Sequence, residues 1–140
     1  MSQDAPAACC TIHSLAHLRA ALAAGAASGR PVVAVSAVGA AAYAGAGWFA
    51  ALNRQGAQDF PQVTLTAVLD CADRAGDVLA ALKAGMRHVI FTGHPDAAGQ
   101  LRAIAAETGA TILSNRPEAC DLLNAEDPAY RARKWCEASR

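Results

Sequence analysis

Short apolar runs alternate with helical patterns along this chain, and each run ends in a polar residue. The runs occupy residues 31–37, 63–69, 89–91 and 111–113, and the polar residues at their ends are Ser36, Asp70, Thr92 and Ser114. Unbroken apolar strands separated by helices are typical of a parallel sheet whose faces are covered. The pattern therefore predicts an α/β fold.

Within this class we expect a three-layer sandwich with a roughly four-stranded parallel sheet, flavodoxin-like or Rossmann-like. The alternative is a (βα)4 half barrel, because connections fix handedness but leave strand order open. A chain of 140 residues fits one domain. We predict a single α/β domain over residues 1–140, with a loose tail at 1–10 and a C-terminal helical segment at 117–140.

Apolar residues spaced by three and four positions predict the helices. The first begins after Ser14, a good N-cap, and ends between the glycines at 25 and 29. Three more helices are expected at 40–55, 73–84 and 95–108. Pro95 suits the first turn of the last one, and Gly109 suits its end.

The helix predicted from Ala40 to Gln55 differs from the others. Its large apolar side chains point around the whole cylinder, and residues 31–53 contain no charge. Such a helix must be covered on more than one side. The sheet can cover one face, and the first helix, the C-terminal segment or a second copy of the chain can cover another. We predict a homo-oligomer through this helix.

The same uncharged stretch is long enough to span a membrane. Its alanines and glycines outnumber its leucines, and its start reads as a strand of the repeating pattern. We therefore do not expect a membrane segment.

Charge and cysteine content exclude several classes. Twelve basic and twelve acidic residues give a net charge of zero, without the basic footprint that nucleic-acid binding needs. Five scattered cysteines do not form a disulfide framework, and the first residues lack the features of a secretory signal. We expect reduced thiols, a cytoplasmic location and no nucleic-acid partner.

The candidate site lies at the carboxyl ends of the strands, where parallel α/β folds gather their ligands. The predicted ligand-binding residues are Ser36, Gly39, Asp70, Thr92, Gly93 and Arg116. The same edge should display Cys71, Asp73, His94, Ser114 and Asn115. Residues of these types also cap helices and close turns, so each has a structural alternative.

Three of these side chains carry specific chemistry. Asp70 ends an apolar strand, where a carboxylate can act as base, metal ligand or ribose acceptor. His94 can titrate near neutral pH, and the two-pronged head of Arg116 can clamp a carboxylate or phosphate. A catalytic role is therefore assigned to Asp70 and His94 as an acid/base pair.

Two other motifs are present in the sequence. Gly45, Gly47 and Ala50 fit the dinucleotide pattern G-x-G-x-x-A, but the pattern requires the glycines directly after a strand, and here they fall inside the predicted helix. Cys9, Cys10, His13 and His17 combine ligand types that hold zinc or copper. No cofactor follows from either motif, and no metal site is assigned.

The leading hypothesis is a small cytoplasmic binding or regulatory module that self-associates and takes a small anionic ligand. The alternative is a small lyase, isomerase or hydrolase. It requires Asp70 and His94 to meet at one substrate position.

Overall fold

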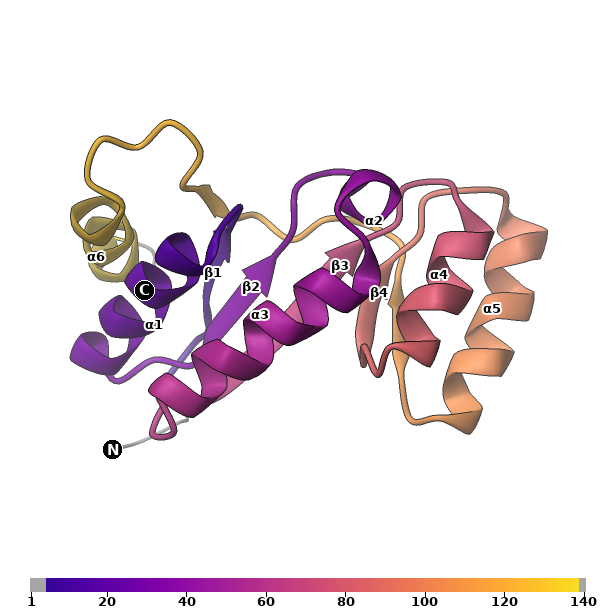
Figure 1. The fold of residues 1–140 in the computed structure, drawn as a ribbon, viewed down its shortest axis with the longest axis horizontal. Helices are drawn as coiled ribbons and strands as arrows, with labels where there is room; N and C mark the ends of the chain where they lie inside the picture. The colour runs from indigo at the N-terminus through magenta and orange to yellow at the C-terminus, as the bar shows by residue number, and fades with distance from the viewer. Residues whose placement is uncertain (1–4, 139–140) are drawn as a thin grey trace. The chain divides into compact units, whose positions relative to one another are not determined.

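The computed structural model describes residues 5–138, which form six strands and six helices (Figure 1). The strands are β1 (Ala8–Thr11), β2 (Val32–Val35), β3 (Leu65–Asp70), β4 (His88–Ile90), β5 (Thr111–Leu113) and β6 (Cys120–Asp121). The helices are α1 (Leu15–Ser28), α2 (Ala40–Tyr43), α3 (Ala46–Asp59), α4 (Ala75–Lys83), α5 (Pro95–Glu107) and α6 (Pro128–Ala138).

The strands form a parallel sheet in the order β5-β4-β3-β2-β1-β6, with helices flanking it. The predicted α/β class is thus confirmed, and the fold is consistent with a three-layer sandwich. The predicted number of strands, four, is too low. Residues 8–10, assigned to a loose tail, lie in β1, and β6 falls where the sequence predicted only helix.

The chain divides into two compact units. The first comprises Met1–Val35, Leu52–Thr66 and Glu118–Arg140, and the second comprises Ser36–Ala51 and Ala67–Pro117. In the first unit β1 pairs with β2 and with β6, and α1 packs against α6 (Figure 1). The core of this unit contains Leu18, Leu22 and Val32. A Cβ on Gly56 of α3 would collide with Leu18, so α1 and α3 are in close contact there.

In the second unit β4 pairs with β3 on one side and with β5 on the other, and α4 lies beside α5. Val78, Val89 and Ile90 are fully buried. His94 is the N-cap of α5 and Pro95 opens its first turn, as a proline without an N–H can.

The helix predicted over 40–55 is two helices. Gly45, at φ +87°, follows α2, and α3 starts at the next residue. Most side chains avoid this backbone region and glycine does not, which explains the break. The G-x-G-x-x-A glycines therefore follow α2 and not a strand, and Gly45 is not inside a helix.

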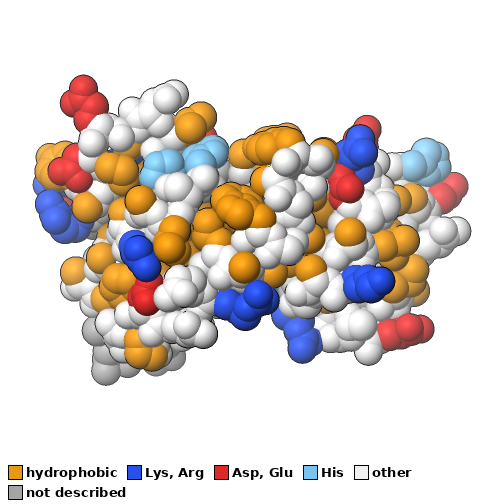
Figure 2. All heavy atoms as spheres, in the orientation of Figure 1, with side chains coloured by type: hydrophobic (Ala, Val, Ile, Leu, Met, Phe, Trp, Pro, Cys, Tyr) orange, Lys and Arg blue, Asp and Glu red, His pale blue; other side chains and the backbone are white. Residues whose placement is uncertain are grey.

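Along this segment Phe49 is completely buried and Leu52 nearly so, but Val38, Tyr43 and Trp48 are exposed by 65%, 72% and 41%. Hydrophobic side chains gather at the surface over α2 and α3 (Figure 2). No helix of the described chain has the length and apolar character needed to cross a membrane.

Candidate functional site

The pairing register brings the predicted strand ends of the second unit into one row. Asp70 pairs with Ile90, and Ile90 pairs with Leu113. The residues that follow each strand therefore emerge together at one edge, as the sequence predicted for Thr92 and Ser114.

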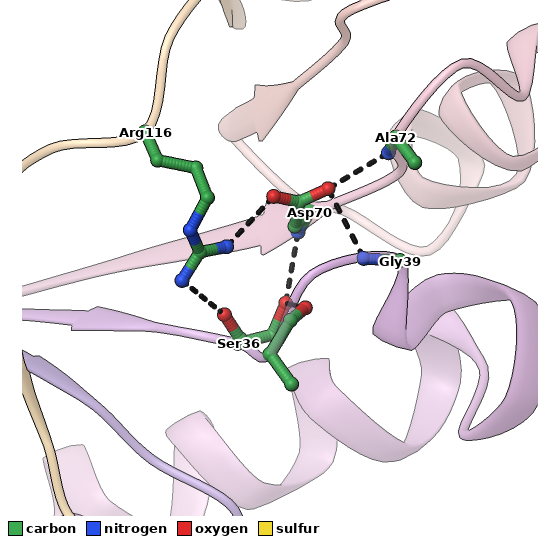
Figure 3. A network of polar contacts seen from close by, with 6 residues as sticks. Ser36, Gly39, Asp70, Ala72 and Arg116 are labelled. Atoms are coloured by element: carbon green, nitrogen blue, oxygen red, sulfur yellow. Dashed lines mark hydrogen bonds and ion pairs between the residues drawn. The ribbon is translucent and has the colours of Figure 1, made fainter.

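Asp70 is the centre of a polar network at this edge (Figure 3). Its side chain is only 2% exposed. Its Oδ1 accepts hydrogen bonds from the backbone N–H groups of Ala72 at 2.8 Å and Gly39 at 3.2 Å. The backbone N–H of Asp70 donates to the Ser36 hydroxyl at 2.9 Å. These contacts tie the end of β3 to the loop that follows β2.

The second carboxylate oxygen of Asp70 faces an arginine. Arg116 Nη1 donates to Asp70 Oδ2 at 2.7 Å, and Arg116 Nη2 donates to the Ser36 carbonyl at 3.0 Å. The Arg116 side chain is 27% exposed. An ion pair with one buried member is costly to break, because the remaining charge loses its partner in a poorly solvated position.

The structure thus brings together four of the predicted binding residues: Ser36, Gly39, Asp70 and Arg116. Both carboxylate oxygens of Asp70 accept hydrogen bonds from within the protein. A carboxylate engaged in this way fixes loops. The structural role predicted for Asp70 as an alternative, a helix cap, is wrong, because the N-cap of α4 is Arg74.

Ala72 has an unusual backbone conformation in this network. Its φ of +50° lies in the left-handed region, which disfavours side chains other than glycine. Its N–H is held by Asp70 Oδ1 at 2.8 Å, and its carbonyl accepts the N–H of Thr92 at 2.8 Å. The strained residue is therefore fixed at both peptide groups, and it connects Asp70 to the loop after β4.

A surface cleft of about 440 Å³ opens beside that loop. Its walls are the segment after β4, the segment after β5 and one face of α5. The lining residues are Phe91, Thr92, Gly93, Pro95, Ala98, Arg102, Ser114 and Asn115. Clefts of this size hold small ligands. Of the predicted binding residues, Thr92 and Gly93 line it.

Gly93 is required by packing. A Cβ at this position would collide with the ring of Phe91, which is 3% exposed. The glycine therefore lets the backbone lie directly on the aromatic ring that forms part of the cleft.

Arg102 is the site residue that sequence reasoning missed. Its Nη2 donates to the Ser114 hydroxyl at 2.6 Å, and among the described residues no carboxylate pairs with it. A signal was present in the sequence: Pro95, Ala98 and Arg102 are spaced by three and four residues, so they share one face of α5. The sequence does not say which loop that face meets.

The remaining predicted residues lie apart from these contacts. His94 Nδ1 accepts the N–H of Asp96 at 3.1 Å, and the His94 side chain is exposed. Neither His94 nor Asp70 lines the cleft. Asp73 is exposed. Burial, with smaller effects of Asp77 and Asp70, raises the pKa of Cys71 to about 12, so its thiol stays protonated and is a poor nucleophile.

The cysteine and histidine group near the N-terminus has its own contacts in the first unit. His13 Nε2 lies 2.7 Å from Asp121 Oδ1, and the backbone N–H of His13 donates to His17 Nδ1 at 3.1 Å. Cys10 is buried and belongs to β1. Within residues 5–138, no group of three or more His, Cys, Asp or Glu side chains is arranged to hold a metal ion.

In comparisons with known proteins, no family model matches the sequence and no curated protein matches it.

Proposed function

We propose that this chain is a cytoplasmic small-molecule binding module whose second unit takes a small anionic ligand in the cleft beside β4, β5 and α5. The observation that carries the proposal is Arg102. Its guanidinium lines the cleft, contacts the Ser114 hydroxyl and has no carboxylate partner among the described residues. A planar guanidinium with free donors is suited to bind carboxylate or phosphate oxygens.

The neighbouring groups suit the same ligand. Thr92 and Ser114 offer hydroxyl donors and Asn115 offers an amide, all along the cleft wall. No acidic side chain is among the lining residues. An anion in the cleft therefore meets one positive charge and several neutral donors.

The test is a titration with inorganic phosphate, in which NMR spectra monitor the backbone amide resonances of Thr92, Gly93 and Asn115. Arg102→Gln should weaken phosphate binding about tenfold, the loss typical of a hydrogen bond to a charged group. Arg74→Gln is the matched control, because Arg74 is an exposed arginine of the same unit that pairs with Asp77. Equal affinity in wild type and Arg102→Gln would refute the proposed site.

A binding role is favoured over the alternative enzyme by the contacts of Asp70. A general base needs a lone pair that substrate can reach, whereas the Asp70 side chain is 2% exposed, accepts internal hydrogen bonds on both oxygens and does not line the cleft. His94 Nδ1 is likewise engaged as the cap of α5. Turnover that disappears in both Asp70→Asn and His94→Gln, with folding retained, would reverse this preference.

We also propose that the module self-associates through the segment that carries Val38, Tyr43 and Trp48. These exposed apolar side chains lie within residues 31–53, which have no charge. An apolar surface of this kind can bury itself against an identical copy. Sedimentation velocity should show an assembly that Trp48→Ser shifts toward monomer, and a monomer at about 100 μM wild-type protein would exclude self-association.

A further inference from the structure

We propose that Asp70 is a positioning residue for the anion cleft, because its carboxylate holds the two loops that form the cleft walls. The inference rests on the proposed function and adds separate roles for the residues in and beside the cleft. Arg102 contacts the ligand, while Asp70 and Arg116 fix the geometry of the groups around it.

One arm of the network runs from Asp70 Oδ1 to the loop after β4. Oδ1 accepts the N–H of Ala72, and the carbonyl of Ala72 accepts the N–H of Thr92, both at 2.8 Å. Thr92 lines the cleft. Ala72 keeps a φ of +50°, a strained conformation for a residue with a Cβ, which persists only where surrounding contacts hold it.

The other arm runs from Asp70 Oδ2 to the loop after β5. Arg116 donates to Oδ2 at 2.7 Å and to the Ser36 carbonyl at 3.0 Å, so its guanidinium is fixed at two points (Figure 3). Ser114 and Asn115, which line the cleft, directly precede Arg116 in the chain. The ion pair therefore limits where these two residues can lie.

The carboxylate suits this task better than an uncharged group. The groups that contact its two oxygens are donors: two backbone N–H groups on one side and a guanidinium on the other. An asparagine has the same shape, but its NH₂ group would face donors on one of the two sides. Asp70→Asn must therefore weaken the hydrogen bonds that hold at least one of the two loops lining the cleft.

A rival explanation makes the opposite prediction. If Arg116 were the ligand-binding arginine and Asp70 merely neutralised it, Asp70→Asn would free the guanidinium and bind anions more tightly. If Asp70 positions the walls, the same change weakens binding, although it removes a negative charge from the region. The direction of the change separates the two.

The experiment compares wild type, Asp70→Asn and Asp73→Asn in phosphate titrations followed by amide resonances. Asp73 is the matched control, because it is an exposed aspartate of the same turn and loses the same charge. We expect about tenfold weaker phosphate binding in Asp70→Asn and a change below about twofold in Asp73→Asn. Unchanged or tighter binding in Asp70→Asn overturns the inference.

Spectra recorded without phosphate keep the inference testable on its own. In Asp70→Asn the amide of Thr92, or those of Ser114 and Asn115, should shift and lose protection from exchange. Arg116→Lys keeps the charge but not the two-point contact, so it should move the amides of Ser114 and Asn115 and leave Thr92 in place. This arm-specific pattern would not arise from general destabilisation.

The two proposals fail in different ways. If wild-type protein shows no response to phosphate, the proposed function fails, and the positioning inference is decided by the ligand-free spectra. If phosphate binds but Thr92, Ser114 and Asn115 are unmoved in both Asp70→Asn and Arg116→Lys, the positioning inference fails alone. A phosphate-dependent shift of the Arg116 side-chain N–H, without one at Arg102, would support the rival.

Discussion

The two units of this protein each contain an arginine that joins distant parts of the chain, and the two are held by different acceptors. Arg30, in the first unit, is 2% exposed and donates to the carbonyls of Pro6 at 2.7 Å, Ala7 at 3.0 Å and Cys136 at 2.6 Å. Arg116, in the second unit, donates to the Asp70 carboxylate and to one carbonyl.

The two arginines differ in what their acceptors can connect. Backbone carbonyls around Arg30 belong to the segment before β1 and to α6, so this guanidinium joins the beginning and end of the described chain. A carboxylate has two oxygens that accept from different directions, so Asp70 can bind Arg116 and two loops at once. The first arrangement joins distant segments of the first unit, and the second joins loops at the carboxyl ends of the strands.

The largest effect is expected for Arg30→Met. Three carbonyls lose their charged donor in a buried position, which should lower the free energy of unfolding by about 3 kcal/mol. Urea denaturation measures the loss. Arg19→Met is the control, because Arg19 forms an exposed pair with Asp59, so its loss should lower the free energy of unfolding far less. Equal losses of unfolding free energy in Arg30→Met and Arg19→Met would show that Arg30 stabilises the protein no more than an exposed arginine does.

Arg116→Gln should lower the free energy of unfolding less than Arg30→Met does, but it should weaken phosphate binding more. Loss of the guanidinium leaves the buried Asp70 carboxylate without its cation, and partial exposure of Arg116 reduces the penalty to about 2 kcal/mol. Phosphate affinity should fall as well, whereas Arg30→Met should leave phosphate affinity unchanged in the folded protein. Calorimetric titration of both variants checks this contrast, which would be lost if both variants bound phosphate equally well.

Gly93→Ala tests cleft shape without altering charge. The added methyl group collides with the Phe91 ring, so we expect a loss of about 1 to 2 kcal/mol by overpacking. Gly99→Ala, on α5 with open space around its Cα, should instead stabilise the protein by up to about 1 kcal/mol. Thermal unfolding of the two variants should therefore shift in opposite directions.

The smallest expected effect is on the pH dependence of stability, through His17 in the first unit. Burial, with a contribution from His13, holds the pKa of His17 below its ordinary value of 6.5. The unfolded chain then binds more protons than the folded one, so stability is full above pH 6.5 and decreases as the pH falls below it. The His17→Gln variant should show a flatter stability profile between pH 6.5 and 5 in urea denaturation. An unchanged slope would exclude His17 as its source.

Several elements follow directly from the sequence. Thr111–Leu113 was predicted with its observed bounds, because three apolar or β-branched residues lie between a glycine turn and a polar residue. Ser14 was predicted as the cap of α1, and its hydroxyl accepts the N–H of His17. In both cases the information is local.

The missed elements depend on partners distant in the chain. Ala8–Thr11 has little strand character by itself and is a strand because it pairs with β2 and β6. Cys120–Asp121 is too short for any periodicity to appear. Gly45 separates α2 from α3 through its positive φ, which a helical pattern with small residues does not reveal.

The candidate site likewise has one part that the local sequence predicts and one part that depends on distant contacts. The pattern of polar strand ends placed Ser36, Gly39, Asp70 and Arg116 at one edge of the sheet, and hydrogen bonds join these residues in the structure. Their role in ligand binding stays a prediction. It could not identify Arg102, which lies in the middle of a helix and gains its position only when α5 packs beside the loop after β5. Catalytic roles for Asp70 and His94 remain predictions.

Ala72 shows how narrow the margin for variation is at such an edge. Replacing it with glycine would relieve the backbone strain at φ +50° but would also free the turn in the unfolded chain, so the two effects oppose each other. A larger side chain would meet the same backbone restriction as alanine and add bulk next to Gly39. Alanine and glycine are therefore the residues that this turn accepts best, and variation at this position should be confined to small side chains.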